Sequence, residues 1–302
     1  MTTQRYGIVG LGKMGGSLAR NLVKAGGKAV VFDLNPASVA ELTDPGIIGA
    51  QSLPDLAASL PAPRIIWIMV PAGNPVDGVI DQLRPHLAPG DLLIDGGNSN
   101  YRDSIRRAAA LKASGIHYLD CGSSGGMEGA LNGLCLMVGG EESAFRLAEP
   151  LFRAIAMEGG YAHVGESGAG HFVKMVHNAI EYGMLQAIGE GFELLESGPY
   201  EVDHQQVARL WNHGSVIRSW LIELAARAFA NDPDLSRISG EVGGGSTGFW
   251  AIEEANRFGV PLPAIAAAYM MRLRSRQPDS FQGKVVAALR REFGGHAVVK
   301  TK

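Results

Sequence analysis

Three glycines in a Gly-x-Gly-x-x-Gly spacing, Gly10, Gly12 and Gly15, constrain the fold of this chain more than any other feature. They follow an apolar run at residues 6–9 that is typical of a buried strand, and they open a segment of helical period at 13–24. In this context Gly10 permits a tight turn, Gly12 lets backbone amides approach a pyrophosphate, and Gly15 lets helix and strand pack closely. We therefore predict a dinucleotide site that also includes Leu11, Lys13 and Met14.

The next apolar run, at 28–32, ends at Asp33, which lies about 20 residues beyond the glycines, as the dinucleotide pattern requires. An acidic side chain at this position binds the ribose 2′-hydroxyl of NAD and repels the 2′-phosphate of NADP. The sequence thus favours NAD, while the nearby cation of Lys13 keeps NADP possible. The alternative, in which the glycines serve packing alone, does not account for Asp33.

Strand-like and helical segments alternate up to about residue 165, which is typical of a parallel sheet covered by helices. We expect strands at 6–9, 28–32, 65–70, 92–94, 116–119 and 134–138, and helices at 13–24 and 102–113. Beyond 165 only helical patterns occur, at 170–196, 202–231, 247–258 and 263–276. The predicted fold is an α/β Rossmann-type doubly wound parallel sheet, residues 1–165, followed by a smaller all-α domain, residues 166–302.

Charge, cysteine content and hydropathy exclude several classes of partner. Lys and Arg number 27 against 30 Asp and Glu, a net charge of −3, so no general attraction to nucleic acid is expected. The two cysteines, Cys121 and Cys135, are too few for a disulfide framework, and no signal peptide is recognisable, so we expect a cytoplasmic protein. The longest apolar run, around 65–70, is far shorter than the roughly 20 residues that span a membrane.

Two further polar loops follow predicted strands. Asn98 comes after the strand at 92–94, and Ser124, Gly125 and Gly126 come after the strand at 116–119. Ligands of open parallel sheets bind outside the carboxyl ends of the strands, so these residues are candidate ligand contacts, although Asn98 alone also fits an ordinary turn. The predicted cofactor contacts include Asn98 as well as Val70, which ends the strand predicted at 65–70, and Pro71, which follows it.

The long helical segment at 170–196 carries one polar stripe. Lys174, His177, Asn178 and Glu181 stand at i, i+3, i+4 and i+7, so they project from the same face. If the stripe lines a cleft, desolvation would favour a neutral lysine that acts as a base, and the glutamate could hold a proton and act as an acid. The alternative is a solvated surface stripe.

The opposite face of this helix is apolar, so we expect a buried helix with a single polar seam. The residues on that face are Phe172, Val176, Ala179, Ile180 and Ala187.

Arginines gather near the end of the chain, and their fork-shaped donors suit a phosphate. The alternative is that they only complement helix dipoles. They are Arg272, Arg274, Arg276, Arg290 and Arg291.

The string at 171–182, His-Phe-Val-Lys-Met-Val-His-Asn-Ala-Ile-Glu-Tyr, closely resembles the catalytic helix of decarboxylating 6-phosphogluconate dehydrogenases. The segments at 94–101, 124–130 and 290–296 look like the same family in the same order. The chain's length is similar to the short form of the family, within the β-hydroxyacid dehydrogenase superfamily.

The resemblance implies oxidative decarboxylation of 6-phosphogluconate to ribulose 5-phosphate and CO2, a step of the pentose phosphate pathway and of gluconate utilization. By this resemblance Lys174 takes the C3 hydroxyl proton and then polarises the C3 carbonyl, and Glu181 protonates C1 of the enediol that remains after CO2 leaves. The resemblance also places His177 and Asn178 among the catalytic residues. The all-α domain would hold substrate and form a homodimer or higher homo-oligomer, with tail residues reaching the partner's site. No metal is expected. The implied sugar-acid contacts are Asn98, Ser124, Gly125, Gly126, His177 and Asn178, and the implied phosphate contacts are Tyr182, Arg272, Arg290 and His296.

One departure from the family pattern concerns the phosphate end of the site. Phe249 stands where the family usually has a lysine or arginine between glycine and tryptophan, which puts phosphate binding in question. Two alternatives therefore remain: a related β-hydroxyacid dehydrogenase that acts on a small unphosphorylated acid, and a non-catalytic NAD-binding sensor. Lys174 and Glu181, which a sensor would not need, are both present.

Overall fold

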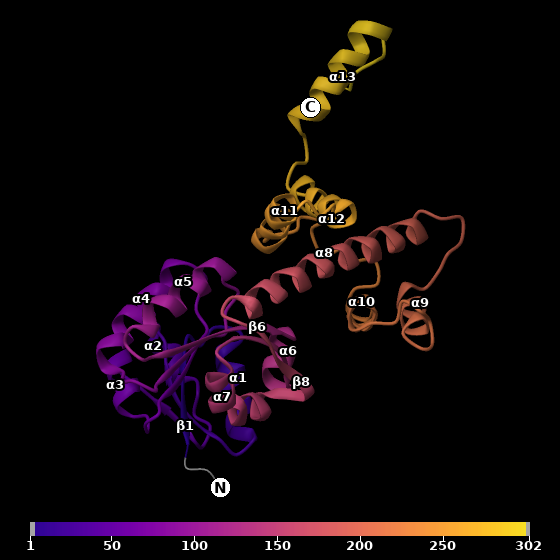
Figure 1. The fold of residues 1–302 in the computed structure, drawn as a ribbon. Coiled ribbons are helices and arrows are strands. Elements are labelled where there is room, and N and C mark those ends of the chain that lie inside the picture. Colours follow the sequence, from indigo (N-terminus) through magenta and orange to yellow (C-terminus); the bar gives the residue numbers. More distant parts are fainter. Residues whose placement is uncertain (1–3, 300–302) are drawn as a thin grey trace. The chain divides into compact units, whose positions relative to one another are not determined.

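The computed structural model describes residues 4–299 and divides into two compact units, one ending at Val176 and one beginning at His177. The first unit contains an eight-stranded sheet and seven α-helices within the described residues (Figure 1). Its strands are β1 (Arg5–Val9), β2 (Lys28–Phe32), β3 (Ile47–Gly49), β4 (Ile65–Ile68), β5 (Leu92–Asp95), β6 (His117–Ser124), β7 (Leu134–Gly140) and β8 (Ala156–Gly165). Its helices are α1 (Gly15–Lys24), α2 (Pro36–Ala40), α3 (Leu53–Ala58), α4 (Asn74–Leu83), α5 (Tyr101–Lys112), α6 (Gly126–Asn132) and α7 (Glu142–Ile155).

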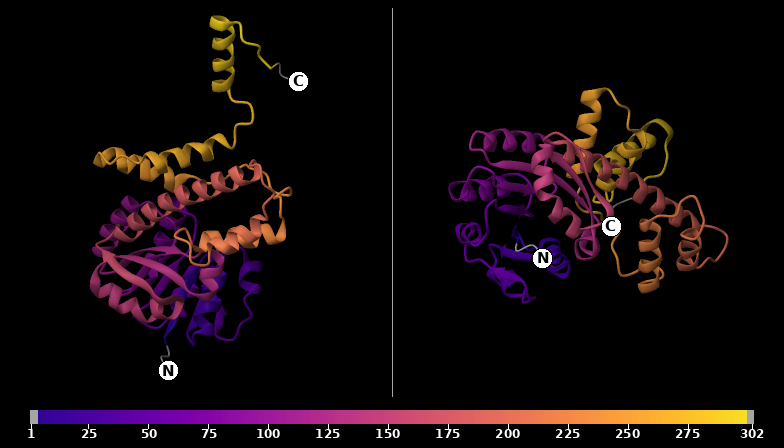
Figure 2. Two further views of the ribbon diagram at one scale, coloured as in Figure 1. Left: turned by 90° about the vertical axis from the view of Figure 1, so that its right-hand side faces the viewer. Right: turned by 60° about the horizontal axis from the view of Figure 1, so that its bottom comes forward.

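The strand order β3-β2-β1-β4-β5-β6-β7-β8 is that of a doubly wound sheet whose order reverses between β1 and β4. Two apolar cores lie on its two faces: one packs the sheet against α1 and α7, and the other against α3, α4 and α5 (Figures 1 and 2). Neighbouring strand residues alternate between them, since Ile8 belongs to the first core and Val9 to the second. The predicted doubly wound α/β fold is confirmed.

The expectation of a wholly parallel sheet is wrong at one pair, because β7 runs antiparallel to β6. A parallel crossover needs roughly a dozen residues or more, and only the short α6 with its flanking glycines separates these two strands. β3 and β8 were not predicted. β3 has only three residues, and β8 contains the pair Gly159 and Gly160, so neither has a strong strand pattern.

Several predicted boundaries also differ from the structure. The strand predicted at 65–70 ends at Ile68, and the strand predicted at 116–119 continues to Ser124. The first helix begins at Gly15 instead of Lys13, and Gly26, with a φ of 86°, follows its end.

The helices after the sheet begin with α8 (Ala169–Glu196), which starts in the first unit and continues into the second. The others are α9 (His204–Trp211), α10 (Trp220–Asn231), α11 (Ser246–Phe258), α12 (Pro263–Arg274) and α13 (Phe281–Gly294). The single helical stretch predicted at 202–231 is wrong. It is broken after Trp211, where Gly214 has a φ of 85° and Ser219 caps the N-terminus of α10 by accepting a hydrogen bond from the Ile222 amide. The helix α13 was not predicted.

Candidate functional site

The glycine-rich turn lies at the carboxyl end of β1, at the point where the strand order reverses. A Cβ on Gly10 would lie 2.3 Å from the Met69 carbonyl oxygen, and one on Gly15 would lie 1.9 Å from the Gly10 carbonyl oxygen. Both positions therefore need glycine for the packing of the turn itself. At Gly12, by contrast, a Cβ would meet no heavy atom within 4 Å, so the backbone there is open to a ligand.

Asp33 follows β2 at the same edge, and its carboxylate holds the glycine turn. Its Oδ2 accepts a hydrogen bond from the Leu11 amide at 2.6 Å, and its Oδ1 accepts one from the Asn35 amide at 2.8 Å. The N-terminus of α1 has no side-chain cap, which leaves its amides for an anion. An open glycine, uncapped amides and a carboxylate at the next strand end fit a dinucleotide with its pyrophosphate on α1. Lys13 and Met14 lie in this turn, and Val70 and Pro71 follow β4 beside it.

Asn98 lies at the same edge, in the loop after β5. Its side chain is exposed, whereas Asp95 before it and Ser99 after it are buried. Asp95 accepts hydrogen bonds from the Gly97 amide at 3.2 Å and from the Ser99 hydroxyl at 2.8 Å. The loop therefore presents Asn98 outward from a fixed backbone.

The third predicted loop begins inside a strand, since Ser124 is the last residue of β6 and does not follow it. Gly125 and Gly126 have φ values of 121° and 58°, a region that favours glycine. Because β6 is parallel to β5, these residues reach the same carboxyl edge as Asn98. The structure thus brings the predicted residues of the first unit to one edge of the sheet.

Lys174 is held against β6 at the start of α8 and is only 8% exposed. A Cβ on Gly122 would lie 2.3 Å from the Lys174 Cβ, so the helix approaches the strand closely only because residue 122 is glycine. Asp120, also on β6 and fully buried, accepts hydrogen bonds from the Gly168 amide at 2.6 Å and the His171 amide at 2.8 Å. The strand therefore fixes the beginning of the helix that carries Lys174.

Asp120 was missed in the sequence analysis. The available signal was a carboxylate that directly follows the strand predicted at 116–119, because a charge buried there needs hydrogen-bond partners.

The polar stripe of α8 has the predicted spacing along one continuous helix. His177 and Asn178 are half-buried, and the His177 Nδ1 lies 3.0 Å from the Asn178 Oδ1. Glu181 is also half-buried.

The expectation that the apolar face of α8 is buried within the chain is wrong. Val176 is 39% exposed and Ile180 is 51% exposed, Ala187 is exposed and Phe172 is only half-buried, whereas Ala179 is buried. An amphipathic pattern indicates a face that packs against something, but it does not indicate whether the same chain provides the cover.

Tyr182 and Arg272 contact each other within the second unit. The Arg272 guanidinium lies 3.7 Å from the centre of the Tyr182 ring, and the Tyr182 hydroxyl lies 3.2 Å from the Thr247 Oγ1. Gly248 permits this packing, because a Cβ there would lie 2.6 Å from the Tyr182 ring. The next residue, Phe249, is 46% exposed.

The other predicted arginines differ in their hydrogen-bond partners and in their exposure. Arg274 donates to the Gln277 carbonyl, and Arg276 donates to the carbonyls of Val242, at 2.9 Å, and Gly244. These two therefore hold the backbone before α11 and the turn after α12. Arg290 and Arg291 on α13, and His296 beyond it, are exposed, and α13 buries none of its residues.

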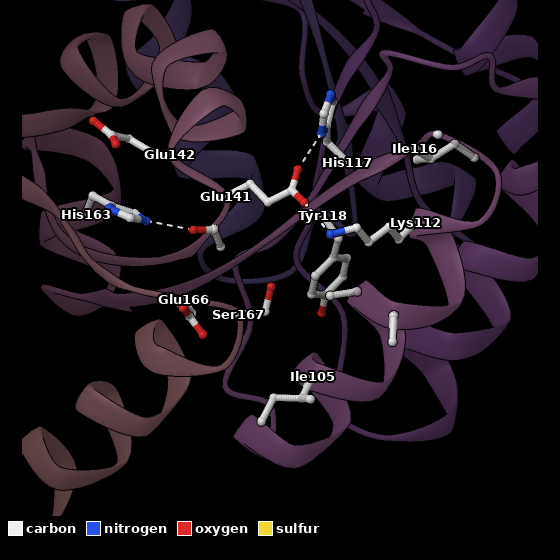
Figure 3. A pocket seen from close by; sticks show the side chains of 14 residues that line it. Ile105, Lys112, Ile116, His117, Tyr118, Glu141, Glu142, His163, Glu166 and Ser167 are labelled. Carbon is white, nitrogen blue, oxygen red and sulfur yellow. Dashed lines mark hydrogen bonds and ion pairs between the residues drawn. The ribbon is translucent and has the colours of Figure 1, made fainter.

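A pocket of about 860 Å³ lies elsewhere in the first unit, and none of the predicted site residues lines it (Figure 3). Glu141 at its centre pairs with Lys112 at 3.0 Å and with His117 at 3.4 Å, and the hydrogen bond from Lys112 lowers the pKa of Glu141. Glu142, also in its wall, pairs with Arg146 outside it. Because none of the predicted residues lines this pocket, it is not the candidate functional site.

Within residues 4–299, no group of His, Cys, Asp and Glu side chains is arranged to hold a metal ion. The described helices also include none that combines the length and the apolar composition needed to cross a membrane.

Two family models together match most of the chain. The model described as the NAD binding domain of 6-phosphogluconate dehydrogenase matches residues 5–165, and the 6-phosphogluconate dehydrogenase C-terminal domain matches residues 170–295. The chain belongs to the 6-phosphogluconate dehydrogenase family. It is therefore an oxidoreductase, as the strings at 171–182 and 94–101 predicted, with an NAD(P)-binding domain, as the turn at Gly10, Gly12 and Gly15 predicted.

Some of the relatives that match this chain have about its length, and others are longer. The Bacillus subtilis protein YqeC is 51% identical, and the NAD(+)-dependent, decarboxylating 6-phosphogluconate dehydrogenase of Haloferax volcanii is 46% identical; each match covers 98% of this chain and 99% of the relative. The decarboxylating 6-phosphogluconate dehydrogenase of Synechococcus elongatus is 41% identical over 91% of this chain but only 62% of its own length.

Solved structures agree on the fold. The Plasmodium falciparum 6-phosphogluconate dehydrogenase, studied with NADP+ and with 6-phosphogluconate, has a TM-score of 0.83 at 29% identity and covers 98% of this chain and 66% of its own. The Mycobacterium tuberculosis 3-hydroxyisobutyrate dehydrogenase has a TM-score of 0.75 at 25% identity, covering 96% of this chain and all of its own. The fold alone therefore does not separate the two substrate classes.

Proposed function

We propose that this protein catalyses the oxidative decarboxylation of 6-phosphogluconate to ribulose 5-phosphate and CO2, with NAD as its preferred cofactor. The observation that carries the proposal is the placement of Lys174: a lysine only 8% exposed, fixed against β6 and followed on the same helix by His177, Asn178 and Glu181. Residues 1–165 act as the dinucleotide-binding domain, and residues 166–302 bind substrate and form the contact between subunits.

The reaction needs a base at the C3 hydroxyl of the substrate and an acid at C1 of the enediol, the former C2, that remains once CO2 has left. NAD, when bound, accepts the hydride that leaves C3. Lys174 takes the C3 hydroxyl proton and then, as a cation, stabilises the negative charge that develops on the C3 oxygen while CO2 leaves. Glu181 gives a proton to C1 of the resulting enediol. Lys174 and Glu181 are seven positions apart on one helix, so both project from the same stripe.

The sugar acid and its phosphate are bound by different groups of residues. The sugar acid is held by Asn98, Ser124, Gly125, Gly126, His177 and Asn178, and the phosphate is held by Tyr182, Arg272, Arg290 and His296. Asn98 also contacts the dinucleotide. The stacking of Arg272 on Tyr182 supports the second assignment, because it orients a guanidinium and a hydroxyl together. Phe249 adds no cation here, so Arg272 and the tail residues supply the positive charge.

The protein acts as a homodimer or a higher oligomer, in which the tail of one copy reaches the site of another. Two exposed apolar surfaces support this proposal. Ile180 and Met184 on α8 are 51% and 41% exposed, and Phe281 and Phe293 on α13 are 80% and 78% exposed. Surfaces of this kind mark protein contacts, and a second copy of the chain would cover both.

Reduction of nicotinamide by the purified protein tests the proposed function. NAD and NADP are each assayed with 6-phosphogluconate, unphosphorylated gluconate and 3-hydroxyisobutyrate. We expect strong turnover only with the phosphorylated acid, and a higher kcat/KM with NAD. Turnover only with an unphosphorylated acid would support the related β-hydroxyacid dehydrogenase. If no acid is oxidised but NAD still binds, the protein is a sensor.

Replacing Asp33 tests the cofactor preference. Asp33→Asn keeps an acceptor for the Leu11 amide but removes the negative charge that repels a 2′-phosphate. We expect the NAD/NADP ratio of kcat/KM to fall about tenfold, which corresponds to about 1.4 kcal/mol of discrimination. Asp55→Asn, which changes a carboxylate at the start of α3, is the control and should leave the ratio unchanged. An unchanged ratio in Asp33→Asn would mean that another residue reads the ribose.

A further inference from the structure

Arg107 lies on α5, outside the residues that the proposed reaction uses, yet its side chain is only 1% exposed. Its guanidinium is bonded to two loops that leave neighbouring strands at the carboxyl edge of the sheet. One is the loop after β4, which begins with Met69, Val70 and Pro71, and the other is the loop after β5, which carries Asn98.

Three hydrogen bonds join Arg107 to Gly73 at the end of the first loop and to Asp77 in the helix that follows it. Arg107 Nε donates to Asp77 Oδ1 at 2.8 Å, and Nη2 donates to Asp77 Oδ2 at 3.2 Å and to the Gly73 carbonyl at 3.0 Å. Gly73 ends this loop with a φ of 85°, and Asp77 lies in the first turn of α4. The fork of an arginine fixes both the distance and the orientation of such a carboxylate.

The bonds to the second loop come from the remaining nitrogen. Nη1 donates to Asp95 Oδ2 at 3.2 Å and to the Ser99 hydroxyl at 3.4 Å. Asp95 in turn binds the Gly97 amide and the Ser99 hydroxyl, the two neighbours of Asn98. The backbone on both sides of Asn98 is therefore tied through Asp95 to Arg107.

The charges of this cluster complement each other. Asp95 is fully buried, and a buried carboxylate without a cation would be costly. The hydrogen bond from Arg107 lowers the pKa of Asp77, so this carboxylate is ionised near neutral pH. Burial raises the pKa of Tyr118 well above its usual value, so its hydroxyl remains protonated and donates to Asp95 at 3.1 Å.

We propose that Arg107 is a positioning residue of the dinucleotide site, which sets the spacing between the loop after β4 and the loop that carries Asn98. The inference rests on the proposed function for the role of Asn98. A buried ion pair contributes little net stability compared with well-packed apolar residues, so stability alone does not explain a guanidinium here. Misplacement of a contact residue by about 1 Å can lower a catalytic rate about a hundredfold.

The test compares Arg107→Lys with Arg106→Lys. Lysine keeps the charge but loses the fork, so it cannot bind Asp77, Gly73 and Asp95 together. Arg106 is the matched control: it also pairs with Asp77, at 3.0 Å, but it is 56% exposed. For Arg107→Lys we expect Kd for NAD, measured by calorimetry, to rise about tenfold and kcat to fall about tenfold or more at a temperature where the variant is folded. Arg106→Lys should match the wild type in both.

Ser99→Ala provides a second variant that leaves every charge paired, in case Arg107→Lys does not fold. It should lower kcat severalfold with a nearly unchanged Tm. The proposal would be overturned if the variants that fold have the Kd and kcat of the wild type and differ from it only in a lower Tm. Arg107 would then have a structural role alone. If the wild type fails to oxidise 6-phosphogluconate, the proposed function fails, but Kd for NAD in these variants still decides the role of Arg107.

Discussion

Replacing Lys174 with methionine should lower kcat for the oxidation of 6-phosphogluconate by at least about a thousandfold, because the variant loses both the base and the cation at the C3 oxygen. Methionine keeps most of the apolar stem, which matters because the Lys174 Cβ packs against Gly122. Methionine is also uncharged, so it introduces no charge in a position that is only 8% exposed. The variant should therefore fold, and its kcat, measured by nicotinamide reduction at saturating substrate, reports the chemistry.

Lys112→Met is the matched control for this experiment. Lys112 is 77% exposed and pairs with Glu141, away from the predicted site, so its loss should leave kcat within about twofold of the wild type, as for most exposed ion pairs. In Lys174→Met the Kd for NAD should also stay near the wild-type value, since the glycine turn and Asp33 are unchanged. A kcat above about one-tenth of wild type would contradict the role of Lys174 as the base, because general base catalysis alone contributes about a hundredfold.

The parts of the site that could be predicted from sequence are those whose chemistry is local. The turn at Gly10 and Gly15 needs glycine for reasons that lie within a few residues, and the helical repeat puts Lys174 and Glu181 on one stripe without any knowledge of the tertiary structure. The strand ends that carry Asp33 and Asn98 meet at one edge because the strands are parallel. That rule applies to every open α/β sheet.

The contacts that could not be predicted join distant segments. Asp77, Asp95 and Arg107 come from α4, β5 and α5, and no spacing in the sequence indicates that one guanidinium binds both carboxylates. The reversal of β7 depends on the short connection after Ser124, which resembles other turns between strands and helices. The exposed face of α8 is a different case, since its pattern predicted an apolar face but does not indicate whether the same chain covers that face.

The proposed assembly, in which the tail of one copy reaches the site of another, can be tested with variants of the tail and then with mixed oligomers. Arg290→Ala combined with His296→Ala should raise KM for 6-phosphogluconate about a hundredfold or more, since two groups that bind the phosphate are lost and each is worth about 1.5–3 kcal/mol. Both side chains are exposed, so the double variant should fold with a Tm near that of the wild type. By itself this result does not identify which copy of the chain each tail serves.

Co-expression of the tail variant with Lys174→Met, under two affinity tags, separates the two arrangements. If each tail completes the site of the other copy, a mixed dimer has one complete site: Lys174 from the tail variant with Arg290 and His296 from the Lys174→Met chain. Random dimers should then recover about one quarter of the wild-type activity, because half of them are mixed and each mixed dimer has one complete site of two. The control mixes Lys174→Met with Glu181→Gln. Both residues lie on the same helix α8, so no complete site can form and activity should not return. If the tail variant also fails to restore activity while mixed dimers are recovered on both tags, the tail serves its own chain, and the exposed helix α13 must fold back onto the copy that carries it.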